Sequence, residues 1–260
     1  MFKKICSLAM LVSLSLAAQQ PFTPKDFYAD YKNILSGVYK DIDAVISPEE
    51  RECVTKTGGS PVYGEITFDS VNVLLTQLNV TKDDVFYDLG SGLGKFIYQI
   101  FLMTPVKKAV GIEFSQSRFD RARSVAGQMP KLYKQTFKFE NSMRKMFGKP
   151  ALEKIKNKSC TFIKGCMLET DFSDATVIFT CSTCFGPEFM EKLALKCATV
   201  DKLRIITLKQ FPYNEHVHYT KMFQLAMTWS SAVPVYMYTV DHSTIAPAYP
   251  VDITKESIKK

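Results

Sequence analysis

The chain has 260 residues, 46% of them hydrophobic, with a formal charge of +7 and a sequence pI of about 8.9. This length can bury one large core and excludes two generous domains with linkers, so one main domain with an appendage is expected. The moderate basic excess fits either solubility alone or an acidic partner, such as nucleic acid, a chromatin-like complex or an anionic membrane surface.

Residues 1–18 have the layout of a secretory signal peptide. Two lysines precede an apolar run, Ile5–Leu16, and small residues follow it, so cleavage is expected after Ala17 or Ala18. The run is too short to span a bilayer as an ordinary transmembrane helix, and the alternative is a buried N-terminal helix of the mature protein. A cleaved leader predicts a secreted protein with no stable membrane association.

Residues 19–60 are expected to form a small helical lobe. The pattern is polar, and aromatic and apolar residues recur at helical spacing from Tyr28 to Val38. The breaker "KTGGSP" then separates this lobe from the main domain, residues 61–245, and a basic tail, residues 246–260, ends the chain.

Apolar runs alternate with amphipathic stretches through the main domain. Helical spacing predicts helices at 69–78, at 96–102 and from 117 onward. Apolar runs predict strands at 85–87, 109–112, 175–180 and 203–208, and two β-rich segments at 223–229 and 235–240 are expected to pair antiparallel. This order predicts an α/β fold whose mostly parallel sheet is covered by helices and ends in an antiparallel hairpin.

Between the predicted strands, Lys131–Lys158 is strongly basic, with nine Lys or Arg side chains against Glu140 and Glu153. Aromatic and apolar residues interleave with the charges, so one face can pack while the other presents cations. Such a face is either an ordinary solvated surface or an electrostatic docking surface for an acidic partner.

The stretch "FYDLGSGLGKF", Phe86–Phe96, is the most informative motif. It ends a strand in Asp88 and turns through Gly90, Gly92 and Gly94, where a doubly wound sheet binds its ligand. A dinucleotide fingerprint spaces its glycines as G-x-G-x-x-G, whereas here the spacing is G-x-G-x-G directly after an acid that would repel a pyrophosphate. The spacing therefore disfavours a nicotinamide cofactor.

S-adenosylmethionine fits these residues better. The glycine amides can receive its carboxylate, and Asp88 can accept from its ammonium group directly or through water. Twenty-five residues later, "AVGIEFS" ends the next strand in Glu113, which can take both ribose hydroxyls. The alternative is a tight turn with incidental acids.

Four other stretches carry a family resemblance. They are "VYGEITFDSV", "GIEFSQSRFDRA", "VIFTCSTCFGPEF" and "VPVYMYTVD". Their order around the glycine loop resembles the non-SET histone lysine methyltransferases of the disruptor-of-telomeric-silencing type, over about Tyr63–Asp241. The most specific part is "YGE" ahead of the glycine loop. The resemblance implies a class I S-adenosylmethionine-dependent methyltransferase fold, with a Rossmann-like, mostly parallel seven-stranded sheet.

The same resemblance implies a cofactor site. Tyr63, Glu65 and Thr67 would form a loop folded over the methionine part of S-adenosylmethionine, and Glu113 would hold its ribose. The glycine loop would hold the amino-acid end of the cofactor through Asp88, Gly90, Ser91, Gly92, Gly94 and Lys95.

At three predicted cofactor positions the sequence differs from the family that it resembles. In the family that the chain resembles, an acidic residue and an aromatic residue bind the adenine. These two positions fall on Cys166 and Met167, so a thiol replaces the acid, while the methionine can still stack on the ring. Cys181 stands where an asparagine would be expected beside the lysine channel. The channel itself would be lined by Thr183, Phe185 and Tyr236.

Methyl transfer from a sulfonium needs positioning more than a dedicated base. An apolar channel helps the acceptor amine to arrive neutral. The leading hypothesis is a protein lysine methyltransferase that docks on a histone or nucleosome through its basic segment, with nucleic acid contact open. With the leader, this suggests a secreted bacterial effector delivered to a host cell nucleus.

Two other functions are compatible with the sequence. One keeps the cofactor but changes the acceptor to a small molecule, a nucleic acid or another protein, although the Asn-Pro-Pro-Tyr type motif of adenine methylation is absent. Another is a cofactor-binding module without turnover, which the cysteines at positions 166 and 181 favour. The sequence carries no signal for an oligomeric state.

No metal site is predicted. Six cysteines lie outside the leader, and with a full apolar core they are expected to be reduced thiols. The motif "CSTC", Cys181–Cys184, has the spacing of half a zinc site, but no second pair completes it. His216 and His218 lack a nearby carboxylate cluster and are expected to face solvent.

Overall fold

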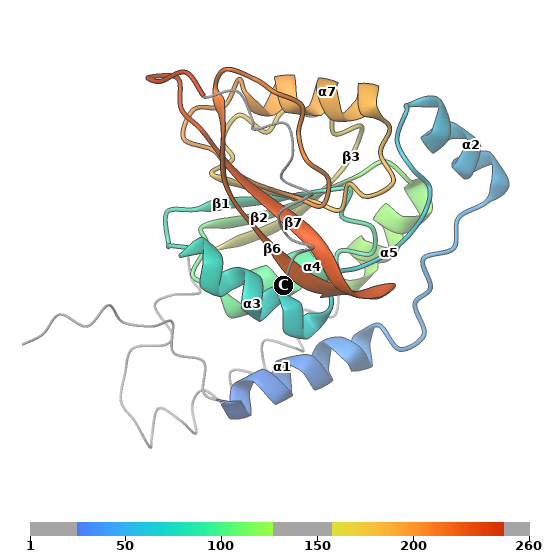
Figure 1. The fold of residues 1–260 in the computed structure, drawn as a ribbon. Helices are drawn as coiled ribbons and strands as arrows, with labels where there is room; N and C mark the ends of the chain where they lie inside the picture. Colours follow the sequence, from blue (N-terminus) through green and yellow to red (C-terminus); the bar gives the residue numbers. More distant parts are fainter. Residues whose placement is uncertain (1–24, 127–157, 247–260) are drawn as a thin grey trace, which may run out of the picture.

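A computed structural model describes residues 25–126 and 158–246. Its centre is a seven-stranded sheet in the order β3-β2-β1-β4-β5-β7-β6 (Figure 1). The predicted leader, nearly all of the basic segment and the C-terminal tail after residue 246 lie outside the described residues. Among the described helices, none is long and apolar enough to cross a membrane.

The first five strands of this order run parallel, and the last two are antiparallel. The parallel strands are β1 (Val85–Leu89), β2 (Lys108–Glu113), β3 (Ser159–Lys164), β4 (Val177–Thr180) and β5 (Arg204–Thr207). The hairpin β6 (Val217–Met227) and β7 (Ser230–Val240) joins the sheet through β5. This confirms the predicted fold, that of class I S-adenosylmethionine-dependent methyltransferases.

Helices cover both faces of the sheet. On one face lie α3 (Phe68–Leu78), α4 (Lys95–Met103) and α5 (Gln116–Ala126), while α7 (Pro187–Cys197) covers the other (Figure 1). Each face has its own buried cluster of apolar side chains. The central strand β1 is buried at all five residues because both of its faces are covered.

Two further helices, α1 (Lys25–Val38) and α2 (Pro48–Lys56), precede the sheet, as the helical spacing in this region predicts. Helix α1 leads into Tyr39, whose hydroxyl donates to the Leu93 carbonyl at 2.8 Å inside a third apolar cluster. Helix α2 begins with Ser47 as N-cap, whose hydroxyl accepts from the Glu50 amide at 3.2 Å. The N-terminal region is thereby packed against the main domain through Tyr39.

Candidate functional site

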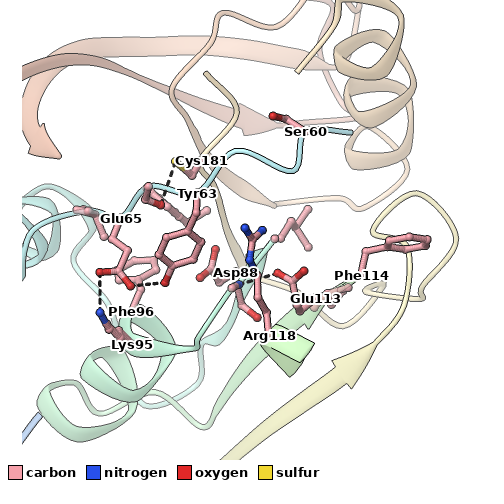
Figure 2. Close-up of a pocket in the computed structure, with 18 of the residues that line it drawn as sticks. Ser60, Tyr63, Glu65, Asp88, Lys95, Phe96, Glu113, Phe114, Arg118 and Cys181 are labelled. Carbon is pink, nitrogen blue, oxygen red and sulfur yellow. Dashed lines mark hydrogen bonds and ion pairs between the residues drawn. The ribbon is translucent and has the colours of Figure 1, made fainter. Parts of the chain in front are cut away.

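A cavity of about 490 Å³ opens at the carboxyl ends of β1, β2 and β4. Side chains from the glycine loop, from residues 57–68 and from the loops after β2, β3 and β4 line it (Figure 2). In an open parallel sheet this is the edge where ligands bind, because the strand order reverses there.

Most predicted cofactor residues line this one cavity. They are Tyr63, Glu65, Thr67, Asp88, Gly90, Ser91, Gly92, Lys95, Glu113, Cys166, Met167 and Cys181. Gly94 does not line it: this residue is the N-cap of α4, with φ of 77°, and a Cβ there would lie 2.5 Å from the Phe162 ring. Gly94 therefore permits close packing of helix and sheet rather than contact with a ligand.

The amides of the glycine loop are already hydrogen-bonded within the protein. Those of Gly90 and Ser91 donate to the Ile112 carbonyl at 2.9 and 3.0 Å, and that of Gly92 donates to Glu113 Oε2 at 2.7 Å. The Gly94 amide donates to the Ser91 carbonyl at 2.8 Å. These bonds correct the expectation that the glycine amides receive a ligand carboxylate, and the loop instead contributes a close backbone surface.

Asp88 is buried, and its side chain has no hydrogen-bond partner in the part of the chain that the structure describes. Burial, with the nearby Glu113 charge, raises the pKa of Asp88 well above its usual range. Among the described residues, none donates a hydrogen bond to its carboxylate. A cationic group in the cavity would relieve this cost, because an opposite charge favours the ionised carboxylate.

Glu113 is buried but better supported. Burial raises its pKa, whereas the amides of Ser115 and Gly92 and the charges of Arg118 and Lys164 act in the opposite direction. The Ser115 amide donates to Oε1 and the Gly92 amide to Oε2, each at 2.7 Å. Each carboxylate oxygen keeps lone-pair capacity for a further donor, such as a ribose hydroxyl.

The segment 64–67 is attached to the end of the C-terminal hairpin. The Thr67 amide donates to the Ala226 carbonyl at 3.2 Å, and the Thr228 amide donates to the Glu65 carbonyl at 2.8 Å. Trp229 covers Gly64 so closely that a Cβ on this glycine would lie 2.3 Å from the indole. The hairpin thereby fixes the segment that carries Tyr63 and Glu65 over the cavity.

Glu65 joins two predicted cofactor residues. Lys95 Nζ lies 3.0 Å from Glu65 Oε2, and the Tyr63 hydroxyl donates to Oε1 (Figure 2). Burial, together with the Glu65 charge, raises the pKa of Tyr63, so its hydroxyl remains a donor. Lys95 begins α4 and also lies over the Tyr39 ring at 5.2 Å, which places one cation beside the glycine loop.

The predicted acceptor channel is only partly assembled. Phe185 lines the cavity and packs on Phe189 with ring centroids 4.8 Å apart. Thr183 is exposed, and Tyr236 pairs with Thr207 in the β5–β7 ladder, so neither residue is among the side chains that line the cavity. The structure therefore brings Phe185 to the site and leaves the other two outside it.

Cys181 and the residues after β3 line the remaining wall. Burial raises the pKa of Cys181 to about 12, so the thiol is neutral beside the Gly64 carbonyl. Met167 lies against Gly90, and the Lys196 ammonium donates to the Met167 carbonyl at 3.1 Å. All six cysteines in the described ranges are free thiols, and no group of three or more metal-binding side chains occurs there.

No sequence motif predicts several of the residues that line the cavity. Phe114 and Arg118 follow Glu113, and Thr228 lies at the end of the hairpin. Their contacts are with residues far away in the chain, so local spacing does not reveal them. Ser91 adds an unusual feature, because its hydroxyl is buried without a hydrogen-bond partner in the described residues.

These features fit S-adenosylmethionine. The unpartnered Asp88 carboxylate suits an ammonium group, Lys95 suits a carboxylate, and Glu113 suits two ribose hydroxyls. The Ser91 hydroxyl does not add to this set, because it is buried against Gly111, where a Cβ on the glycine would lie 2.6 Å from it.

Comparisons with known proteins agree with this geometry. The family model described as histone methylation protein DOT1 matches residues 43–237. A histone-lysine N-methyltransferase specific for H3 lysine-79 from Caenorhabditis elegans is 26% identical over 234 residues, which cover 83% of this chain and 24% of the relative. Its Drosophila melanogaster counterpart is 29% identical over 155 residues, which cover 58% of this chain and 8% of that relative. The chain thus spans a quarter or less of these relatives.

Solved structures with a similar fold are more distant. An RNA methyltransferase from Salinibacter ruber in complex with S-adenosyl-L-homocysteine has a TM-score of 0.46 and 20% identity, covering 67% of this chain and 92% of that one. A putative RNA methyltransferase from Pyrococcus horikoshii has a TM-score of 0.48 and 13% identity, covering 82% and 99%.

Proposed function

Because the chain belongs to the histone methylation protein DOT1 family, we propose that it is an S-adenosylmethionine-dependent protein lysine methyltransferase that acts on a histone within a nucleosome. The cofactor supplies an activated methyl group on a sulfonium. The chain supplies position and environment, which is what an in-line displacement requires.

The observation that supports this proposal most strongly is the pair of acids at the ends of β1 and β2. Asp88 and Glu113 are buried at neighbouring strand ends, and both line the cavity. Asp88 would hold the cofactor ammonium and Glu113 the ribose hydroxyls. Lys95 would take the carboxylate that the engaged glycine amides leave without a partner.

The acceptor side of the cavity favours a neutral amine. Phe185 and the neutral thiol of Cys181 line it and desolvate an incoming amine, although the charges of Asp88 and Glu65 also act on Cys181. Desolvation disfavours the charged form of a lysine, so deprotonation before attack is easier there. No dedicated base is required, because water can carry the proton away.

Transfer of labelled methyl groups from S-adenosylmethionine to nucleosomes and to free histones would test the activity. Wild type should label lysine, and Asp88→Asn should not. Asp174→Asn is the matched control, because Asp174 lies at the opposite end of β1, where it pairs with Lys108 at 2.9 Å. Cofactor binding by calorimetry without labelling of any lysine would contradict the proposal.

A different acceptor is the second candidate. It is favoured by the position of Thr183 and Tyr236, which do not join Phe185 at the cavity. A screen of RNA, small nucleophiles and other proteins with labelled cofactor would distinguish it, and binding without transfer to any acceptor would indicate a cofactor-binding module.

We also propose that the protein is exported and acts in a host cell. The sequence of residues 1–18 and the need for an intracellular methyl donor motivate this. The basic segment, Lys131–Lys158, would then dock on the acidic surface of chromatin. Fractionation of the producing cells is the test, and uncleaved protein confined to their cytoplasm would contradict export. Reversal of the segment's charges should weaken nucleosome binding while leaving cofactor binding intact.

A further inference from the structure

Arg118 is a buried cation in the first turn of α5 that lines the cavity. Its Nε donates to the Ala44 carbonyl at 3.0 Å, and its Nη2 donates to the Pro61 carbonyl at 2.9 Å. The guanidinium also lies over the Tyr63 ring, 4.9 Å from its centroid. A cation at a helix N-terminus is unfavourable, so this position needs a compensating contact.

Glu113 compensates this cation through space, because no hydrogen bond or ion pair joins the two side chains in the described residues. Figure 2 shows the Arg118 side chain between Tyr63 and Glu113. Burial lowers the pKa of Arg118, and the charge of Glu113 acts against this shift. Two other charged groups face Glu113: Lys164, which supports its ionised form, and Asp88, whose ionisation it opposes. Lys164 is exposed, so Arg118 is the buried cation beside this carboxylate.

We propose that Arg118 is a positioning residue that holds Tyr63 over the cofactor and favours the ionised form of Glu113. Its charge favours the ionised form of Glu113, which can accept hydrogen bonds from the ribose hydroxyls. Its two carbonyl bonds and its stacking hold residues 61–63 in place, so that Tyr63 covers the methionine end. This inference rests on the proposed use of S-adenosylmethionine.

Glu50 provides a matched control because it ties the same segments together outside the cavity. Its Oε1 accepts from the Ser117 amide at 2.9 Å and from the Ser115 hydroxyl at 3.1 Å, so α2 is joined to the first turn of α5. Glu50 is not among the lining residues, although it and Arg51 are the other charges that face Arg118. Glu50→Gln should loosen the N-terminal region while it keeps the Arg118 cation near Glu113.

The experiment is calorimetric titration of the full chain with S-adenosyl-L-homocysteine across acidic to alkaline pH. Arg118→Met should weaken binding about tenfold near neutrality. It should also raise, by about one unit, the pH below which binding is lost, because Glu113 loses its neighbouring cation and is protonated more easily. Arg118→Lys should keep the wild-type pH profile with weaker binding throughout, since lysine cannot reproduce the two carbonyl bonds and the stacking. Glu50→Gln should lower the melting temperature and keep the wild-type pH profile.

Superposable pH profiles for Arg118→Met and Glu50→Gln would overturn the inference, because Arg118 would then be only a structural tie. If Arg118→Met does not fold, Arg118→Gln takes its place: it loses the charge but retains an amide donor, and the same pH shift is expected. Absence of binding by wild type at every pH would instead overturn the proposed function, and this inference with it.

Discussion

The ring of Tyr63 lies on the backbone of Gly92, where a Cβ would fall 2.6 Å from Cε2 of the tyrosine. Gly92 also has φ of 53°, a conformation that side chains other than glycine adopt at a cost. The glycine therefore gives the tyrosine its place over the cavity.

Gly92→Ala should cost at least about 1 kcal/mol in the free energy of unfolding and displace Tyr63. We expect weaker binding of S-adenosyl-L-homocysteine in calorimetry. Gly37→Ala is the control: this helical glycine has no neighbour within 4 Å, so its replacement should stabilise the protein by about 0.5 to 1 kcal/mol. Unchanged affinity in Gly92→Ala would contradict the placement of Tyr63 at the cofactor.

Asp88→Asn should stabilise the ligand-free protein while it reduces cofactor affinity. The folded-state pKa of Asp88 is raised above the unfolded value, so ionisation is disfavoured in the folded chain and stability falls as pH rises above the unfolded value. Removal of this acid should add about 1 kcal/mol at neutral pH and weaken ligand binding about tenfold or more.

Thermal melts with and without S-adenosyl-L-homocysteine measure both effects of Asp88→Asn. The variant should melt above wild type alone and gain little from the ligand. A variant that melts below wild type at neutral pH would show that Asp88 has a stabilising partner.

Asp84→Ala should destabilise the fold without affecting the cofactor site. Asp84 lies just before β1 and pairs with Arg204, and it accepts from the Thr81 amide at 2.6 Å and the Thr176 hydroxyl at 2.6 Å. Although burial raises its pKa, these hydrogen bonds and the Arg204 charge lower it overall. Its stabilising effect is therefore present above the unfolded-state pKa and is lost as pH falls toward the folded value.

We expect Asp84→Ala to lower the free energy of unfolding by about 3 kcal/mol, because it leaves a partly buried arginine unpaired. Chemical denaturation near neutral pH measures this. The exposed neighbour Asp83 is the control, and Asp83→Ala should change stability by less than about 0.5 kcal/mol. Equal effects in the two variants would contradict a specific role for Asp84.

Alkylation should separate the cysteines by burial. Burial raises the pKa of Cys160, Cys181 and Cys197 to about 12 each, so these thiols should resist iodoacetamide in the folded protein. Cys53 and Cys184 are exposed and should react first. Peptide mass spectrometry after brief labelling measures the order, and rapid labelling of Cys181 would contradict its enclosed position.

The sequence predicted the central sheet well because its signals are local. β1, β2, α3, α4 and α5 follow the expected positions within a few residues, since each combines an apolar run with a clear turn or cap. The sequence pattern does not indicate β3, because exposed residues alternate with partly buried ones in this edge strand and a lysine-rich stretch precedes it. β6 also begins earlier than expected, at Val217.

The sequence predicts a site residue well where a single motif contains both the chemical group and the end of the strand that positions it. Asp88 and Glu113 end strands, so sequence alone placed them at one edge of the sheet. The sequence does not predict Arg118 as a site residue, because its hydrogen-bond partners are the carbonyls of Ala44 and Pro61, which lie far away in the chain. Tyr236 was expected in the channel, but its position depends on the register of β7 against β5, which no local pattern fixes.

The amides of Gly90, Ser91, Gly92 and Gly94 donate to Ile112, Glu113 and Ser91 in the ligand-free protein. The conformation of the glycine loop is therefore preorganised, and little chain entropy remains to be lost on association. We expect a nucleoside to bind with little rearrangement of this loop or of the segment that bears Tyr63, because the C-terminal hairpin also holds that segment in place.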